Sequence, residues 1–146
     1  MERNEARQWY EQNHRRYQDF MEKVRRLMEE LLRSEGIPVH SVTGRLKDRE
    51  SFVEKCERKG YDRPEQAMDM AGLRVITHTT AEVEQVCALI RREFQIDEAN
   101  SGDKGAALEV DRVGYLSVHF VAKLSAPRLE LPEYRRFDRL CCEIQV

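Results

Sequence analysis

The sequence predicts an α+β domain in which a mixed sheet of about five strands is flanked by helices and preceded by one long helix. Stretches with the period of an amphipathic helix alternate along the chain with stretches in which apolar residues recur at every second position. Such alternation is typical of helices packed on a mostly buried sheet. The chain has 146 residues, a length that suits one domain with its own core.

One long helix is predicted for residues 3–34. Four apolar side chains recur there every seven residues, with two methionines between them: Tyr10, Tyr17, Val24 and Leu31, with Met21 and Met28. This apolar seam either packs on the domain, which we favour, or pairs with another subunit in a homo-oligomer. Gly36 ends the helix and Pro38 prevents its continuation. We therefore expect residues 1–36 to form an N-terminal helix and residues 37–146 to form the main domain.

The remaining segments alternate between predicted strands and helices. Residues 49–59 should form a helix that ends at Gly60, and residues 81–94 a second amphipathic helix. Extended or alternating patterns predict strands within five segments: 39–43, 69–77, 95–100, 115–124 and 140–146. We expect a mobile loop over residues 101–113 and a connector over residues 131–139.

The overall composition excludes several classes of function. The net charge is -2, so the chain as a whole is not a basic nucleic-acid-binding surface. No window approaches the roughly 18–20 apolar residues that span a bilayer, so no membrane contact is expected. The polar N-terminus lacks the apolar core of a signal peptide, which predicts a cytoplasmic location. The four cysteines form no CxxC pair and the four histidines are scattered, so a zinc site is not expected.

Two carboxylates occupy unusual places in apolar segments. Asp69 opens the run that leads into a predicted strand, and Glu143 lies inside the apolar final strand. A carboxylate in such a strand pays a desolvation cost unless a cation, a metal or a water-filled cleft receives it. If the two strands are neighbours, the pair could hold a magnesium ion together with substrate phosphates. The alternative is that both side chains simply face water.

A basic segment precedes these carboxylates. Arg45 and Lys47 share a face if the chain is extended there, and Ser51 and Lys55 lie one helical turn apart. Such a group could hold a triphosphate, with backbone donors from the start of the following helix. The alternative is an ordinary solvated helix with neighbouring opposite charges.

The stretch GYLSVHF, residues 114–120, places polar groups at alternating positions of a predicted strand. Because side chains alternate between the two faces of a strand, Tyr115, Ser117 and His119 must share one face. That face is either the solvated side of the sheet or the floor of a site.

These motifs occur together in a recognisable order. The pattern R-x-K-x-x-x-S-x-x-x-K over residues 45–55 is followed by DMAGLRVI, GYLSVH and EIQV. From about Val42 to Val146 the chain resembles the synthetase domain of the RelA/SpoT alarmone enzymes, especially their small single-domain relatives. Each motif alone is weak, whereas four in this order are specific. The resemblance implies a nucleotidyltransferase-like fold.

The resemblance also implies an activity and a role for each motif residue. The activity is transfer of pyrophosphate from ATP to the 3′-hydroxyl of GTP or GDP, giving (p)ppGpp, with Mg²⁺ as the cofactor. The residues implied as ATP contacts are Arg45, Lys47, Ser51, Lys55 and Arg74. The acidic pair is implied as catalytic: Asp69 as a magnesium ligand, and Glu143 as the group that activates the acceptor hydroxyl and shares the metal. The residues implied to bind the acceptor nucleotide are Tyr115, which stacks on the base, with Ser117, His119 and Gln145.

The chain departs from the family pattern in two places. Many long family members have a lysine three residues before the Gly-Tyr pair and an asparagine just before the glycine, where this chain has Asp111 and Val113. These departures leave the choice between GTP and GDP open. The family normally continues after E-I-Q-x with an Arg-Thr pair and a Q-H-A-W helix, whereas this chain stops at Val146. We therefore expect the C-terminal part of the family domain to be absent.

Three functions remain at this point. The first is an alarmone synthetase. The second is a toxin-like relative that pyrophosphorylates the 3′ end of tRNA, which would need a basic surface for the RNA backbone. The third is a non-catalytic, nucleotide-binding regulatory module, which the retention of both carboxylates disfavours.

Overall fold

The computed structural model describes residues 1–103 and 117–146. Its strands are β1 (Ser41–Leu46), β2 (Ala71–Ile76), β3 (Phe94–Ile96), β4 (Gly102–Asp103), β5 (Val118–Leu124) and β6 (Cys141–Gln145). Its α-helices are α1 (Arg3–Ser34), α2 (Arg49–Lys59), α3 (Thr80–Glu93), α4 (Ala126–Leu129) and α5 (Pro132–Arg135). The predicted α+β class, with helices around one mixed sheet and a long N-terminal helix, is confirmed.

The sheet places the last strand of the chain at its centre. Five strands run in the order β1-β2-β6-β5-β3, and the short β4 pairs with β5. The pair β2 and β6 is parallel, while the other pairs are antiparallel. This order brings the strand that begins the basic segment, the strand with Arg74 and the strand with Glu143 side by side.

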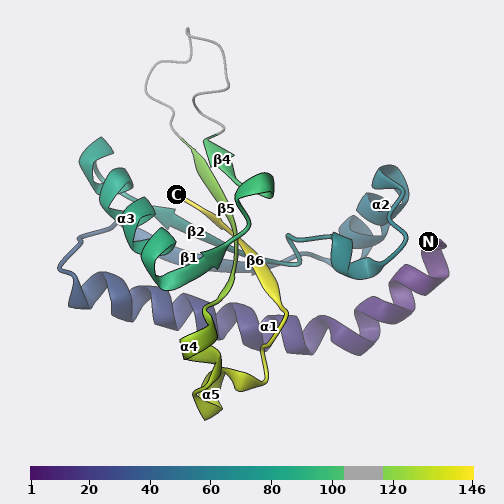
Figure 1. Ribbon diagram of the computed structural model, residues 1–146. Coiled ribbons are helices and arrows are strands. Elements are labelled where there is room, and N and C mark those ends of the chain that lie inside the picture. The colour runs from purple at the N-terminus through teal and green to yellow at the C-terminus, as the bar shows by residue number, and fades with distance from the viewer. Residues whose placement is uncertain (104–116) are drawn as a thin grey trace, which may run out of the picture.

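One face of the sheet is buried beneath helices. Alternate residues of the central strands, such as Leu73, Phe120 and Ile144, belong to one apolar core with side chains of α1 and α3. Figure 1 shows α1 as a long purple helix along the sheet, with α2 near its N-terminal end and α3 near the other. At that other end, Arg92 of α3 forms an ion pair with Glu35, just after α1. The side chains of the opposite face point away from this core and are therefore available for a functional site.

The apolar seam of α1 packs on its own domain, as the sequence analysis favoured. Tyr17, Val24 and Met28 are buried in the shared core. Contact with β1 is so close at Gly44 that a Cβ there would lie 2.1 Å from the Sδ of Met21. Glycine at position 44 therefore allows α1 to approach the sheet edge.

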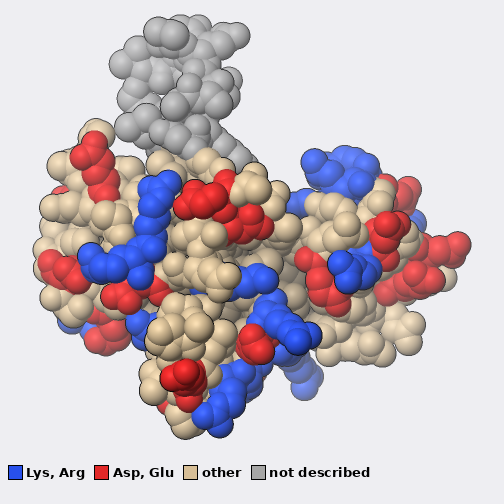
Figure 2. Space-filling model, in the orientation of Figure 1, with Lys and Arg blue, Asp and Glu red and all other residues tan. Residues whose placement is uncertain are grey.

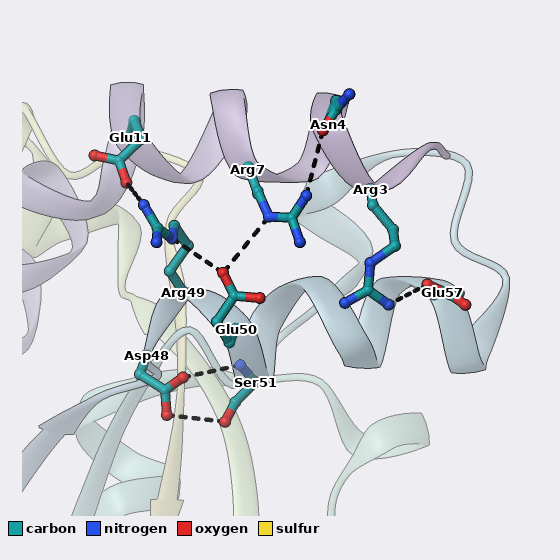
Figure 3. A network of polar contacts seen from close by, with 9 residues as sticks. All are labelled: Arg3, Asn4, Arg7, Glu11, Asp48, Arg49, Glu50, Ser51 and Glu57. Carbon is teal, nitrogen blue, oxygen red and sulfur yellow. Dashed lines mark hydrogen bonds and ion pairs between the residues drawn. The ribbon is translucent and has the colours of Figure 1, made fainter.

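The helix α2 has the predicted bounds because its two ends are specified by sequence. The Asp48 carboxylate accepts hydrogen bonds from the backbone N–H and the hydroxyl of Ser51, and Gly60 ends the helix with a φ of 65°. Exposed ion pairs join the first turns of α1 to α2 (Figure 3): Arg3 with Glu57, Arg7 with Glu50, and Glu11 with Arg49.

Other predicted boundaries were wrong. The strand predicted over residues 95–100 covers only Phe94–Ile96, because Asp97 then turns the chain by accepting a hydrogen bond from the backbone N–H of Asn100. The predicted loop contains β4 at its start. Prolines at the first turn begin the short helices α4 and α5, and α5 occupies part of the predicted connector. Among the described residues, no helix is both long enough and apolar enough to cross a membrane.

Candidate functional site

The predicted site residues on the described strands lie on the face of the sheet opposite the core, here called the open face. Residues paired across neighbouring strands point to the same side of a sheet. One row across four strands contains Thr43, Arg74, Gln145 and His119. The next row contains Arg45, Gly72, Glu143 and Val121. The strand order thus collects residues from four separate sequence motifs on one surface.

A cavity of about 290 Å³ opens on this face. Its lining includes five predicted site residues: Arg45, Asp69, Arg74, Glu143 and Gln145. Both predicted catalytic carboxylates therefore border one cavity, as expected for neighbouring strands. Thr43 and Gly72 also line it, and sequence reasoning missed them. The period-two alternation of β1 could have indicated Thr43, since it shares a face with Arg45.

Asp69 lies in the turn before β2, held between two lysines. The Nζ of Lys47 is 3.0 Å from Oδ2, and the Nζ of Lys55 is 2.9 Å from Oδ1. All three side chains are mostly buried, with exposures between 14% and 20%. Burial alone would raise the pKa of the Asp69 carboxyl, but the contacts from Lys55 and Lys47 outweigh it and hold that pKa below its usual range. The site thus contains a charged triad of one anion and two cations.

The two lysines come from different elements that the sheet brings together. Lys47 directly follows β1, where its backbone N–H donates to the carbonyl of Met70 at 2.9 Å. Lys55 lies on α2, one turn after Ser51. Ser51 itself borders a small hollow of about 80 Å³ with Arg45 and Lys47. The predicted ATP contacts of the basic segment are therefore neighbours, although the Ser51 hydroxyl donates to Asp48 at 2.8 Å.

The two predicted guanidinium contacts lie near one another on the open face. Arg45 pairs with Gly72, and Arg74 lies two residues further along β2, so the two arginines are diagonal neighbours. Such diagonal positions are about 7–8 Å apart at the backbone, within reach of one ligand for two long side chains with planar guanidinium groups. Arg45 has no ion pair with any side chain in the described part of the chain. This arrangement can therefore receive a base or a phosphate.

Glu143 is held by the predicted acceptor residues. Oε1 of Glu143 is 2.8 Å from Nδ1 of His119, and Nε2 of His119 is 2.9 Å from Oγ of Ser117. Ser117 also accepts a hydrogen bond of 3.0 Å from Nε2 of Gln145. The prediction that Ser117 and His119 share a face is confirmed. Tyr115, the third member of that group, lies outside the described residues.

A second cavity of about 450 Å³ lies beside Arg74. It is bordered by Ser117 and Gln145 of the open face and by residues that lead into α3, among them His78 and Thr80. Sequence reasoning missed these residues, since it predicted a helix only from residue 81. In the structure Thr79 caps α3 by accepting from the N–H of Glu82. The two cavities lie on either side of Arg74 and Gln145, which border both.

The acidic pair fits a magnesium ion better than a metal held by protein ligands alone. Within residues 1–103 and 117–146, no three or more His, Cys, Asp or Glu side chains form a metal-binding group. Both oxygens of the Asp69 carboxylate are paired with a lysine, Oδ1 with Lys55 and Oδ2 with Lys47, so a magnesium ion there would share or replace one of these contacts. One or two carboxylates completed by phosphate oxygens are a donor set that magnesium accepts. Asp69 and Glu143 therefore fit such an ion.

The sequence matches a known family model. Residues 44–146 match the model described as a region found in RelA / SpoT proteins. No curated protein matches the sequence.

Solved structures share the fold. The small alarmone synthetase 1 from Bacillus subtilis, bound to its product pppGpp, superposes with a TM-score of 0.74 at 23% identity, over 94% of this chain and 73% of that one. The same synthetase bound to AMPCPP gives a TM-score of 0.68 at 20% identity, over 94% of this chain and 69% of that one. A GTP pyrophosphokinase family protein from Streptococcus pneumoniae gives 0.69 at 25% identity, over 94% and 68%.

Proposed function

The chain belongs to the RelA/SpoT family, and on that premise we propose that it transfers pyrophosphate from ATP to the 3′-hydroxyl of GDP or GTP. One observation carries the proposal: Arg45, Arg74, Asp69 and Glu143, from three separate motifs, border a single cavity on the open face. The similar structures bound to pppGpp and AMPCPP support nucleotide substrates of these two kinds.

In this proposal ATP occupies the β1 and β2 side of the open face. The diagonal pair of Arg45 and Arg74 receives the base, while Lys47 and Lys55 at Asp69 supply positive charge for phosphates. Pyrophosphoryl transfer depends mainly on positioning and on neutralising charge, and these cations provide both. Ser51 is proposed to add a polar contact at the start of α2.

The acceptor nucleotide is proposed to lie over β5 and β6, beside Glu143. The carboxylate takes the proton of the 3′-hydroxyl, the 3′-oxygen forms a bond to the β-phosphorus of ATP, and the bond from that phosphorus to the oxygen bridging the α-phosphate breaks. AMP leaves with the electron pair of that bond. His119 keeps Glu143 aimed at the acceptor, and Tyr115 is proposed to stack on the acceptor base.

A magnesium ion held by Asp69 and Glu143 with phosphate oxygens would neutralise charge on the transferred group. We propose Mg²⁺ as the cofactor on the basis of the donor set described above. We also place the protein in the cytoplasm, where both nucleotides are available. Cys56, Cys141 and Cys142 are free thiols, as expected in a reducing compartment.

The face of the molecule drawn in Figure 2 gives no support to an RNA substrate. Basic and acidic side chains are interspersed over the described part of that face (Figure 2), whereas RNA backbone binding favours a continuous basic surface. We therefore do not propose the tRNA reaction, and we use tRNA only as one arm of the test.

The test follows the label from ATP to the acceptor. The full chain is incubated with ATP labelled at the γ-phosphate, Mg²⁺, and either GDP, GTP or deacylated tRNA. We expect label on GDP or GTP and none on tRNA. Label on tRNA alone would contradict the proposal. Absence of any transfer, with both nucleotides bound, would identify a binding module instead.

A further inference from the structure

Four hydrogen bonds connect the two halves of the open face in one line. Nη2 of Arg74 lies 3.5 Å from Oε1 of Gln145, and Nε2 of Gln145 lies 3.0 Å from Oγ of Ser117. Ser117 is then 2.9 Å from Nε2 of His119, whose Nδ1 is 2.8 Å from Oε1 of Glu143. The line therefore runs from a proposed ATP contact to the proposed general base.

The direction of the first two bonds follows from the groups themselves. A guanidinium has donors and no acceptor, so the amide oxygen of Gln145 faces Arg74. The amide nitrogen of Gln145 is then turned to Ser117 and donates to its oxygen. Because the Ser117 oxygen accepts this bond, its own hydrogen remains for another partner.

That partner is the histidine ring. Ser117 is only 4% exposed, although it borders the second cavity, and a buried hydroxyl is normally satisfied by a partner within the protein. Nε2 of His119 is at hydrogen-bond distance, and the described residues provide no other acceptor for this hydroxyl. A neutral imidazole that accepts at Nε2 carries its hydrogen on Nδ1. Nδ1 faces the Glu143 carboxylate, which accepts that hydrogen.

We propose that Ser117 and Gln145 are positioning residues, which hold His119 with its hydrogen on Nδ1 and so fix the Oε1 of Glu143. The second oxygen of Glu143 is then left for the acceptor hydroxyl. This inference rests on the proposed function for the task of Glu143, whereas the direction of the hydrogen bonds is independent of it. In this proposal Ser117 holds the ring of His119 and does not itself contact a ligand.

The same three side chains have the order of a Ser-His-acid hydrolase triad, but two observations disfavour that role. Ser117 is only 4% exposed, so little of the residue is open to the second cavity that it borders. The amide of Gln145 also donates to the Ser117 oxygen, which lowers its electron density where a nucleophile needs it. Ser117 therefore orients the ring of His119 and does not attack a substrate.

Nitrogen NMR of the histidine rings tests the direction of the line. The full chain is labelled with ¹⁵N, and His119 is assigned by comparison with the His119→Asn variant. We expect the neutral ring of His119 to carry its hydrogen on Nδ1, with Nε2 accepting a hydrogen bond. Ser117→Ala should shift the Nε2 resonance towards that of a free acceptor, and Ser117→Thr should restore it. A hydrogen on Nε2 in the parent chain would overturn the proposal.

A second variant, Gln145→Glu, reverses the direction of the hydrogen bond between residue 145 and Ser117 while it keeps the size of the side chain. In Gln145→Glu the side chain can no longer donate, so the Ser117 hydroxyl should turn to the new carboxylate and leave Nε2 of His119. We expect the same Nε2 shift as in Ser117→Ala. An unchanged Nε2 resonance in the folded Gln145→Glu protein would also overturn the proposal.

Kinetics separates a positioning role from a structural one. We expect Ser117→Ala to lower kcat about tenfold to a hundredfold, with the KM for ATP within about threefold, because the base is misaligned while ATP binding is retained. Ser117→Thr should recover most of the loss. Ser125→Ala is the control, because Ser125 directly follows β5 and its side chain makes no capping hydrogen bond. Parent-like kcat in Ser117→Ala would contradict the positioning role.

These outcomes separate the inference from the proposed function. If the parent chain transfers no pyrophosphate, the proposed function fails and the NMR result alone decides the direction of the line. If the parent chain is active and Nε2 of His119 carries the hydrogen, the proposed function stands and the positioning role of Ser117 and Gln145 is rejected.

Discussion

At the scale of single residues, Asp69 shows how the site balances charge before nucleotides bind. Its carboxylate is paired with Lys47 and Lys55, and each lysine is also a proposed phosphate contact. When phosphates bind, the lysines gain new anionic partners and Asp69 can contact a magnesium ion. The two lysines therefore serve as counter-ions of Asp69 in the free protein, and in the proposed complex they would turn to phosphate oxygens.

The depressed pKa of Asp69 predicts how stability depends on pH. Its ionised form stabilises the fold, so this contribution is complete above the ordinary value of 3.8 and is lost as the pH falls through the lower folded-state value. We expect Asp69→Asn to cost about 1–3 kcal/mol at pH 7, less than for a fully buried pair because the lysines reach solvent. The variant should lose less further stability than the parent between about pH 5 and pH 2.

Chemical denaturation at a series of pH values measures both effects. Asp62→Asn serves as the control, because Asp62 is exposed and its side chain has no ion pair with the described residues. Equal losses of stability for the parent and Asp69→Asn on acidification would show that the two lysines do not hold the Asp69 charge in the folded protein.

The sequence predicted the identity of these residues better than their contacts. Asp69 and Glu143 were identified because carboxylates are unusual in apolar segments. The ion pairs of Asp69 with Lys47 and Lys55 join α2 to the end of β1 and to the turn before β2, and no local sequence pattern contains that tertiary contact. The link from Gln145 to Ser117 likewise depends on the pairing of β6 with β5.

At the scale of elements, the approach of α1 to β1 is governed by one glycine. A Cβ at position 44 would overlap the Sδ of Met21, a side chain that is only 3% exposed. We expect Gly44→Ala to destabilise the protein by about 1–3 kcal/mol, the range for overpacking a core. The double variant with Met21→Ala should be more stable than the sum of the two losses predicts, because the truncated side chain makes room for the new methyl group.

Gly72→Ala provides the matched comparison. Its added Cβ would lie 3.8 Å from the carbonyl oxygens of Arg45 and Glu143, an ordinary contact distance. We expect a smaller loss of stability there than at Gly44. Strict additivity of Gly44→Ala and Met21→Ala in thermal or chemical denaturation would show that the close approach is not the cause.

Element boundaries were predictable where a local signal marks both ends. The bounds of α2 matched because Asp48 and Gly60 specify them within the sequence. The strand predicted over 95–100 failed because the Asp97 turn competes locally with extended structure. The helices α4 and α5 each have only four residues, too few to display a helical period.

At the scale of the whole molecule, the strand order explains why the site exists. The parallel pairing of β2 with β6 places the last strand between the strand of Arg74 and the strand of His119. Two nucleotides on either side of β6 would each lie next to Glu143. The helices cover the other face, so the core and the site use opposite sides of one sheet.

In the proposed mechanism Glu143 acts on the acceptor hydroxyl between two bound nucleotides. Glu143→Gln tests it most directly, because the amide keeps the size of the side chain and its oxygen can still accept from His119, while it can no longer take a proton. The measurement is the rate of label transfer from ATP to the acceptor, alongside calorimetric binding of that acceptor and a non-hydrolysable ATP analogue. We expect transfer to fall about 10²–10⁴-fold, the range for a general base, with both affinities within about threefold of the parent. Transfer at the parent rate in the folded variant would contradict the assignment of Glu143 as the base.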